Sequence, residues 1–158
     1  RNKVQYITRK HKLKIKKCSV CGNLTEDNTC EICTDELRVK DIICIVKDPR
    51  DIMAFEKSKT FNGLYHVLGG IIDPLNGVTV DDLDINKLEK RLTSDIKEVI
   101  LALDPSLEGE TTSLYLSRII KDKNIKVSRI ASGIPMGGNI EFSDIATLSR
   151  SLEGRKEI

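Results

Sequence analysis

The sequence predicts an α/β fold, with a mostly parallel sheet flanked by helices and preceded by a small four-cysteine module. Short apolar runs alternate along the chain with segments of helical periodicity, and Gly, Pro, Asn and Asp separate them. Two C-x2-C motifs stand ahead of the first apolar run. Alternation of this kind is typical of parallel strands joined by right-handed helical crossovers. With 158 residues, the chain can build one core and a small satellite module.

Each element follows from its local pattern. The first strand is the continuous apolar run DIICIV, as expected for a strand covered on both faces. The strands are expected at residues 41–46, 63–68, 96–103 and 127–131. Asp48 can cap the helix that follows the first strand, with Pro49 in its first turn and Asp51 three residues after the cap. Further helices are expected at residues 85–93, at 110–124 and in the tail that begins at 142.

The cysteine motifs predict a metal site. The segment CSVCGNLTEDNTCEIC spaces its cysteines as C-x2-C-x8-C-x2-C, and the predicted ligands are Cys18, Cys21, Cys30 and Cys33. Two such pairs supply the four sulfurs that structural zinc prefers, with no open position for water. The alternative is a pair of disulfides, although nothing in the sequence indicates an oxidising compartment. Cys44 lies inside an apolar run and is interpreted as a small buried hydrophobe.

The charge of the chain is unevenly distributed. The first 17 residues hold no acid and eight basic residues: Arg1, Lys3, Arg9, Lys10, Lys12, Lys14, Lys16 and Lys17. The remainder carries 18 basic against 24 acidic residues. A basic arm on an acidic body favours contact with DNA, because Lys and Arg bind phosphate and release counterions. The alternative is a solvated basic face or a linker.

Acidic residues follow the predicted strands. In a parallel sheet the loops after the strands meet at one edge, which brings together residues 47–51, Gly69-Gly70 with Asp73, and residues 104–110. The acids expected there are Asp48, Asp51, Asp104, Glu108 and Glu110. Their carboxylates could hold Mg2+. They could equally serve as helix caps and as charges that favour helix N-termini.

Three stretches in order resemble one known family. The loop DPSLEGET is similar to the D-P-D-x-E-G-E signature of Toprim domains. The segment at 45–78 (IVKDPRDIMAFEKSKTFNGLYHVLGGIIDPLNGV), the four-cysteine module and the tail SRIASGIPMGGNIEFSDIATLSRSLEGRKEI resemble the bacterial recombination mediators of the RecR family. This likeness implies a Toprim-type sheet and the following domains: a basic helical connection at 1–17 leading from a missing helix-hairpin-helix domain, a zinc module at 18–38, a Toprim domain at 39–132, and a loop and helical tail at 133–158.

The resemblance also implies partners and a location. Proteins of this family form ring-shaped clamps on DNA and act with the proteins RecO and RecF, helping RecA replace single-strand-binding protein on gapped DNA. The acidic Toprim face would then dock a basic partner, and the basic arm would contact DNA. A tetrameric ring is expected at full length and a dimer for this chain. A bacterial cytoplasmic, nucleoid-associated protein is expected.

Two departures from the Toprim pattern argue against catalysis. Catalytic Toprim domains resemble one another in a glutamate after the first strand and in D-x-D after the third. Lys47 stands at the first position, and Ser106 replaces the second aspartate. A lysine ammonium would compete with Mg2+ for the remaining carboxylates, so Mg2+ and enzymatic activity are not expected. Tyr65, His66 and Tyr115 are interpreted as packing residues rather than as nucleophiles or bases.

Two other functions stay open at this stage. A Mg2+-dependent nuclease or topoisomerase-like enzyme is supported by Asp104 and Glu108 alone. A zinc-ribbon protein that binds a nucleotide would need a phosphate-binding loop, and neither G-x-x-x-x-G-K-[ST] nor G-x-G-x-x-G occurs in the sequence. The mediator role is therefore the leading hypothesis.

Overall fold

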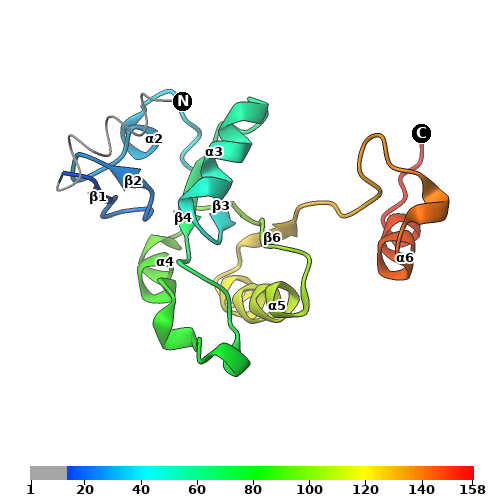
Figure 1. The fold of residues 1–158 in the computed structure, drawn as a ribbon. Coiled ribbons are helices and arrows are strands. Elements are labelled where there is room, and N and C mark those ends of the chain that lie inside the picture. Colours follow the sequence, from blue (N-terminus) through cyan, green and yellow to red (C-terminus); the bar gives the residue numbers. More distant parts are fainter. Residues whose placement is uncertain (1–13) are drawn as a thin grey trace. The chain divides into compact units, whose positions relative to one another are not determined.

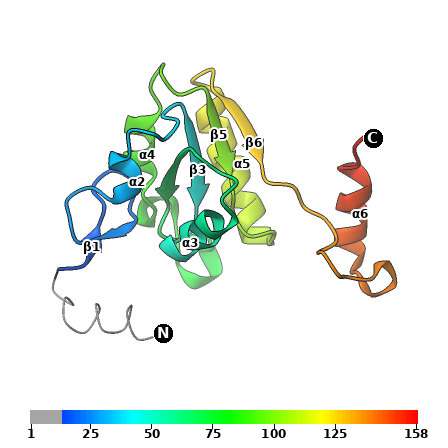
Figure 2. The ribbon, with the colours of Figure 1, turned by 90° about the horizontal axis from the view of Figure 1, so that it is seen from above.

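The computed structural model describes residues 14–158, and the chain divides into two compact units, one that ends at Ser128 and one that spans Arg129–Ile158. The four-stranded sheet consists of β3 (Ile42–Val46), β4 (Leu64–Val67), β5 (Glu98–Leu101) and β6 (Lys126–Arg129), and the boundary between the units falls at the last residue of β6. The strand order is β4-β3-β5-β6, and β3 pairs parallel with both β4 and β5 (Figures 1 and 2). The predicted α/β fold is confirmed.

The helices follow the strands as predicted, with shifted ends. They are α3 (Pro49–Ser58), α4 (Ile85–Arg91) and α5 (Leu107–Lys121), and two short 3-10 turns, η1 (Pro74–Asn76) and η2 (Val80–Asp82), lie between β4 and α4. The predicted cap of α3 is confirmed, because Asp48 and Asp51 form a reciprocal capping box with Pro49 in the first turn. Helix α5 begins three residues earlier than the predicted residue 110, because Ser106 caps it.

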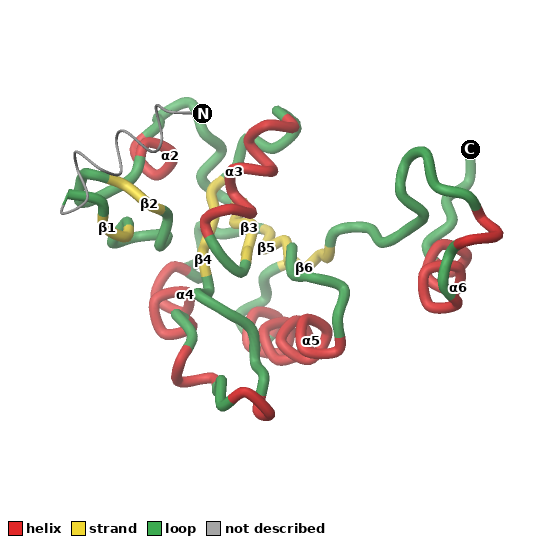
Figure 3. Tube along the Cα trace, viewed as in Figure 1, coloured by secondary structure: helices red, strands yellow, loops and turns green. Residues whose placement is uncertain are grey.

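Both faces of the sheet are buried, as the apolar run at β3 predicts. Ile43 and Ile45 pack in a cluster with residues of α4 and α5. Cys44 and Val46 point to the other face, where they pack with Ile52 of α3. Figures 1 and 3 show α3 on one side of the strands and α4 and α5 on the other. The alternation along β3 therefore decides which helix each side chain meets.

The cysteine module precedes the sheet in the chain. It consists of β1 (Lys16–Lys17), β2 (Leu24–Thr25) and the short helix α2 (Glu31–Thr34). The helical connection predicted for residues 1–17 is wrong at Lys16 and Lys17, which pair antiparallel with Thr25 and Leu24. The two paired strands lie on either side of the first cysteine motif in the chain and hold its ends together. Ile32 of α2 packs against the cysteines and also against the face of the sheet that α3 covers.

The second unit holds the 3-10 turn η3 (Ile140–Phe142) and the helix α6 (Ile145–Glu153). The helix predicted in the tail is confirmed, and Asp144 caps it by accepting from the Thr147 amide. Several apolar side chains of this unit are exposed: Met136, Ile140, Phe142, Ile145 and Leu152. Among the described residues, no helix is both long and apolar enough to cross a membrane.

Candidate metal centre and acidic face

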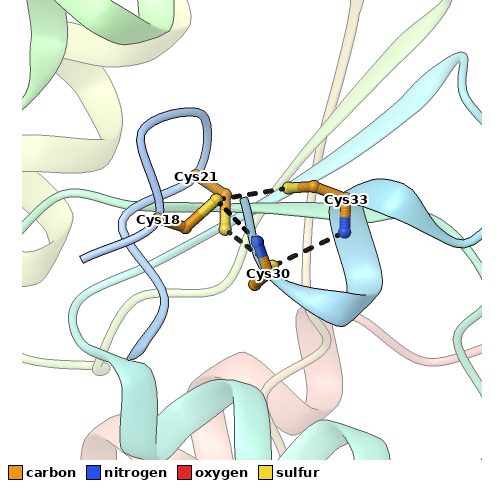
Figure 4. Close-up of side chains that lie close together, drawn as sticks. All are labelled: Cys18, Cys21, Cys30 and Cys33. Carbon is orange, nitrogen blue, oxygen red and sulfur yellow. Dashed lines mark hydrogen bonds between the residues drawn. The ribbon is translucent and has the colours of Figure 1, made fainter. Parts of the chain in front are cut away.

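The four predicted ligands converge on one point. The Sγ atoms of Cys18, Cys21, Cys30 and Cys33 all lie within 4.8 Å of one another. Cys18 Sγ lies 3.8 Å from Cys33 Sγ, and Cys21 Sγ lies 3.6 Å from Cys30 Sγ (Figure 4). The cysteines carry no disulfide. Because Zn–S bonds are about 2.3 Å, a tetrahedral ion would hold its sulfurs about 3.8 Å apart. The residues present therefore fit a four-coordinate zinc ion.

Backbone amides around the cluster point at the sulfurs. Cys30 N lies 3.3 Å from Cys18 Sγ, Asn23 N lies 3.4 Å from Cys21 Sγ, and Cys33 N lies 3.5 Å from Cys30 Sγ. Amide dipoles in this orientation stabilise negative charge on sulfur, as bound thiolates require. Gly22 permits the turn after Cys21, since its φ is +83°.

The module docks on the edge strand β4. The amide of Val67 donates to the carbonyl of Cys21 across 2.7 Å. A Cβ atom on Gly22 would lie 3.1 Å from Val67 Cβ, so the approach of the two backbones is close. Docking here covers part of an otherwise unpaired strand edge.

The loops that follow β3, β4 and β5 meet at the carboxyl ends of these strands. Lys47 follows β3 and Asp104 follows β5, and Lys47 Nζ lies 2.7 Å from Asp104 Oδ2. The Gly69 amide donates to the Lys47 carbonyl across 2.9 Å, which brings in the loop after β4. The ion pair raises the pKa of Lys47, chiefly through its hydrogen bond to Asp104. Strand β4 pairs on one side of β3 and β5 on the other, and ligands of parallel sheets bind at such switch points. Lys47 thus places a fixed cation there.

The other acids serve the ends of helices. Asp48 accepts from the Arg50 amide and pairs with the Arg50 side chain, whose hydrogen bond lowers the pKa of Asp48. Glu108 and Glu110 lie in the first turn of α5. Asp73 accepts from the Asn76 side chain in the loop after β4. Within residues 14–158, the four cysteines form the one group of three or more metal-ligating side chains close enough for a single ion.

Ser106 and Gly109 determine how the loop that begins at Asp104 passes from β5 into α5. Ser106 Oγ accepts from the Gly109 amide across 3.1 Å, so this residue caps α5 where the Toprim pattern has an aspartate. A Cβ atom on Gly109 would lie 2.0 Å from the carbonyl oxygen of Asp104. Only glycine permits α5 to start this close to the end of β5.

The residues interpreted as packing groups lie in different surroundings. Tyr65 and His66 are buried in β4, and Cys44 is buried in β3, where burial raises the pKa of its thiol to about 12. Tyr115 lies at 37% exposure on α5, so it packs only partly. Of the predicted DNA-contacting residues, Lys14, Lys16 and Lys17 are exposed, and the remaining five lie outside the described residues.

Sequence reasoning missed two partly buried arginines. Arg38 pairs with Glu56, which also accepts from the Tyr65 hydroxyl across 2.7 Å. Arg91 of α4 donates to the Tyr65 carbonyl across 2.6 Å and to His66 Nδ1 across 3.0 Å. Neither arginine stands in a motif, so only the tertiary structure reveals these contacts.

Three family models match the chain in order: a RecR zinc finger domain of the four-cysteine type at residues 15–35, a Toprim domain at 41–131, and a RecR C-terminal region at 133–156. The fold and the cysteine cluster thus define a zinc-finger Toprim protein. Proteins called recombination protein RecR from two strains of Clostridium perfringens are 54% identical over 144 residues, which cover 91% of this chain and 73% of the relative. The chain belongs to the RecR family, and its role is in recombination and DNA repair.

Proposed function

We propose that this chain is a non-catalytic recombination mediator. It forms a clamp on DNA and, with RecO and RecF, helps to load RecA onto gapped DNA coated with single-strand-binding protein. Family membership supports this role, and the ion pair between Lys47 and Asp104 carries the non-catalytic part of the proposal. Such a protein works beside chromosomal DNA in the bacterial cytoplasm.

The ion pair matters because of where it lies. A metal-dependent Toprim enzyme needs carboxylates that are free to hold Mg2+ at the carboxyl ends of the strands. Here the Asp104 carboxylate is already paired with the Lys47 ammonium, whose Nζ lies 2.7 Å from Asp104 Oδ2. A divalent ion would have to displace it and would then lie beside a like charge. Mg2+ is therefore not a cofactor in this proposal.

Zinc has a structural role in the proposal. Cys18, Cys21, Cys30 and Cys33 would hold it with four sulfurs, and this closed set has no position for a reacting water. The ion would supply folding energy to a module whose own apolar cluster is confined to the cysteines and Ile32.

Partner contact is proposed at the acidic Toprim face, which comprises Asp48, Asp51, Asp104, Glu108 and Glu110. Charge reversal at Glu108 and Glu110 should weaken the binding of a basic partner such as RecO about tenfold or more, measured by titration calorimetry. A matched control reverses Asp81 and Glu89, which are exposed elsewhere on the same unit. Equal affinities for the two double variants would remove this docking face.

DNA contact is proposed for the basic arm of residues 1–17, and subunit contact for the Toprim and C-terminal regions (39–132 and 133–158). The exposed apolar side chains of the second unit support the subunit contact, because such groups commonly mark interfaces. A dimer is expected for this chain, within a tetrameric ring at full length. A mass of four subunits in light scattering would contradict the dimer.

The direct test of the non-catalytic role is DNA integrity. Labelled single-stranded and gapped DNA is incubated with the protein in Mg2+ or Mn2+ and resolved on a denaturing gel. Intact DNA at every metal concentration is the expected result. Cleavage that is lost in an Asp104→Ala variant would instead establish the alternative function, a Mg2+-dependent Toprim nuclease or topoisomerase-like enzyme.

A further inference from the structure

The exposed edge of β4 brings the cysteine module and helix α4 to neighbouring positions. Strand β4 lies at the end of the sheet, so one row of its amides and carbonyls has no partner strand. The Val67 amide on this edge donates to the backbone carbonyl of Cys21, and the Tyr65 carbonyl accepts from the Arg91 guanidinium. Residues two apart in a strand direct their backbone groups to the same side. Arg91 and the cysteine cluster therefore lie side by side along one edge.

The Arg91 guanidinium is held firmly in this position. Its Nη1 atom donates to the Tyr65 carbonyl and to His66 Nδ1. Because an arginine only donates, His66 Nδ1 must accept, and the imidazole proton lies on Nε2, which donates to the Asp84 carbonyl across 2.8 Å. His66 is 1% exposed, and burial lowers its pKa to about 4, so the ring stays neutral and keeps this tautomer.

Arg91 is a partly buried cation that lacks the usual carboxylate partner. The cysteine module lies beside it on the same strand edge, where the Cys21 carbonyl accepts from the Val67 amide two residues along from the Tyr65 carbonyl that Arg91 binds. The ion pairs among the described residues join Arg91 to no carboxylate. Charges removed from water are paired with an opposite charge or coordinate a metal, and an arginine, which has no lone pair to offer a metal, needs an opposite charge.

The cysteine cluster in turn needs a positive charge nearby, because its zinc-bound form is negatively charged. Four thiolates around one Zn2+ leave a formal charge of about −2. Three of these cysteines are only 1–2% exposed, so water screens that charge poorly. A fixed guanidinium beside the sulfurs offsets the cost of burying it.

We propose that Arg91 is the counter-charge of the zinc–thiolate centre, and that it couples metal binding in the cysteine module to helix α4 of the Toprim domain. The inference rests on the zinc site proposed above. Arg91 is a positioning residue that holds charge beside the ligands and does not itself bind the metal.

The test compares zinc affinities of the full chain, measured by competition with a chromogenic chelator. Arg91→Gln removes the charge but retains a donor for the Tyr65 carbonyl, whereas Arg91→Lys keeps the charge. Lys90→Gln is the matched control, since it removes the same charge from an exposed neighbouring position on α4. Arg91→Gln should bind zinc about 10- to 100-fold more weakly, while Arg91→Lys and Lys90→Gln stay within about threefold of the parent.

A spectroscopic readout separates a charge effect from loss of stability. With Co2+ in place of zinc, the thiolate-to-cobalt charge-transfer band should move to longer wavelength in Arg91→Gln and not in Arg91→Lys, because removal of a nearby cation raises the energy of the sulfur electrons. Parent affinity in Arg91→Gln, or an Arg91→Lys variant as weak as Arg91→Gln, would overturn the role of Arg91. A parent chain that binds no zinc would overturn the zinc site itself.

Discussion

At the scale of single residues, several charged or polar groups make contacts that the sequence does not reveal. Lys47 pairs with Asp104 across the switch point, and Arg91 orders His66 on the edge strand. His66 is neutral by burial and accepts a hydrogen bond that its charged form could not accept. Protonation of this ring must therefore work against folding.

The pH dependence of stability tests that statement. The pKa of His66 is about 4 in the folded chain, against an ordinary value of 6.5. Between these values the unfolded chain binds a proton that the folded chain does not, so the contribution of His66 is complete above pH 6.5 and is lost as the pH falls toward 4. One pKa unit corresponds to about 1.4 kcal/mol, so the total loss is about 3 kcal/mol.

Urea unfolding between pH 7 and pH 4.5 would measure the loss. The parent chain should lose stability more steeply than a His66→Gln variant, by about 1 kcal/mol per pH unit below pH 6. The comparison cancels the titration of carboxylates that both chains share. Parallel pH profiles for the two chains would show that His66 does not titrate as its burial requires.

At the scale of elements, local signals decide where the helices begin. The capping box of Asp48 and Asp51 starts α3, and Ser106 starts α5. The predicted start of α5 at residue 110 is late because the pattern of apolar residues marks the packed face and not the cap. Farther along, Arg38 binds Glu56 of α3, and Glu56 accepts from Tyr65 of β4. This polar network ties the segment after the cysteine module to a helix and a strand.

Replacing Gly109 by alanine tests whether helix propensity or steric contact decides the stability at the start of α5. Helix propensity alone would make Gly109→Ala stabilising by about 1 kcal/mol. The added Cβ atom would instead lie 2.0 Å from the Asp104 carbonyl oxygen, so α5 must shift. We expect the variant to be destabilised by about 2–3 kcal/mol in urea unfolding.

Gly133→Ala is the control for this substitution. Its new Cβ atom would lie 3.7 Å from Ser151 Oγ, which is ordinary contact. It should change the free energy of unfolding by less than about 0.5 kcal/mol. A stabilised Gly109→Ala variant would mean that the close start of α5 is not required by the fold.

At the scale of the whole molecule, the cysteines divide into two classes with different chemistry. Four converge in the module, while Cys44 is 3% exposed in the sheet and its thiol has a pKa of about 12. With zinc bound, none of the five cysteines should react quickly with a maleimide, since four are ligands and one is buried. Chelation should release four reactive thiols, and the fifth should react only in denaturant.

Mass spectrometry after each step counts the labels. A Cys44→Ala variant provides the control, because it should lose the denaturant-dependent label and keep the four released by chelation. Rapid labelling of the cysteines in the metal-loaded protein would contradict the closed four-sulfur site. Labelling of Cys44 upon chelation alone would show that the sheet opens when the module loses its metal.

The sequence by itself determined the alternation of strands and helices and the four cysteine ligands, because these depend on local periodicity and spacing. The loss of two Toprim acids was also read from the sequence, through its resemblance to Toprim domains. The tertiary structure alone decided that Lys47 meets Asp104 and that Arg91 binds the same strand edge on which the cysteine module docks. These pairs join residues from separate elements, and their contacts depend on strand order and docking. It also separated the acids: Asp104 pairs with Lys47, Asp48 and Asp51 cap α3, and Glu108 and Glu110 lie in the first turn of α5. Within residues 14–158 the five therefore do not close around a single ion.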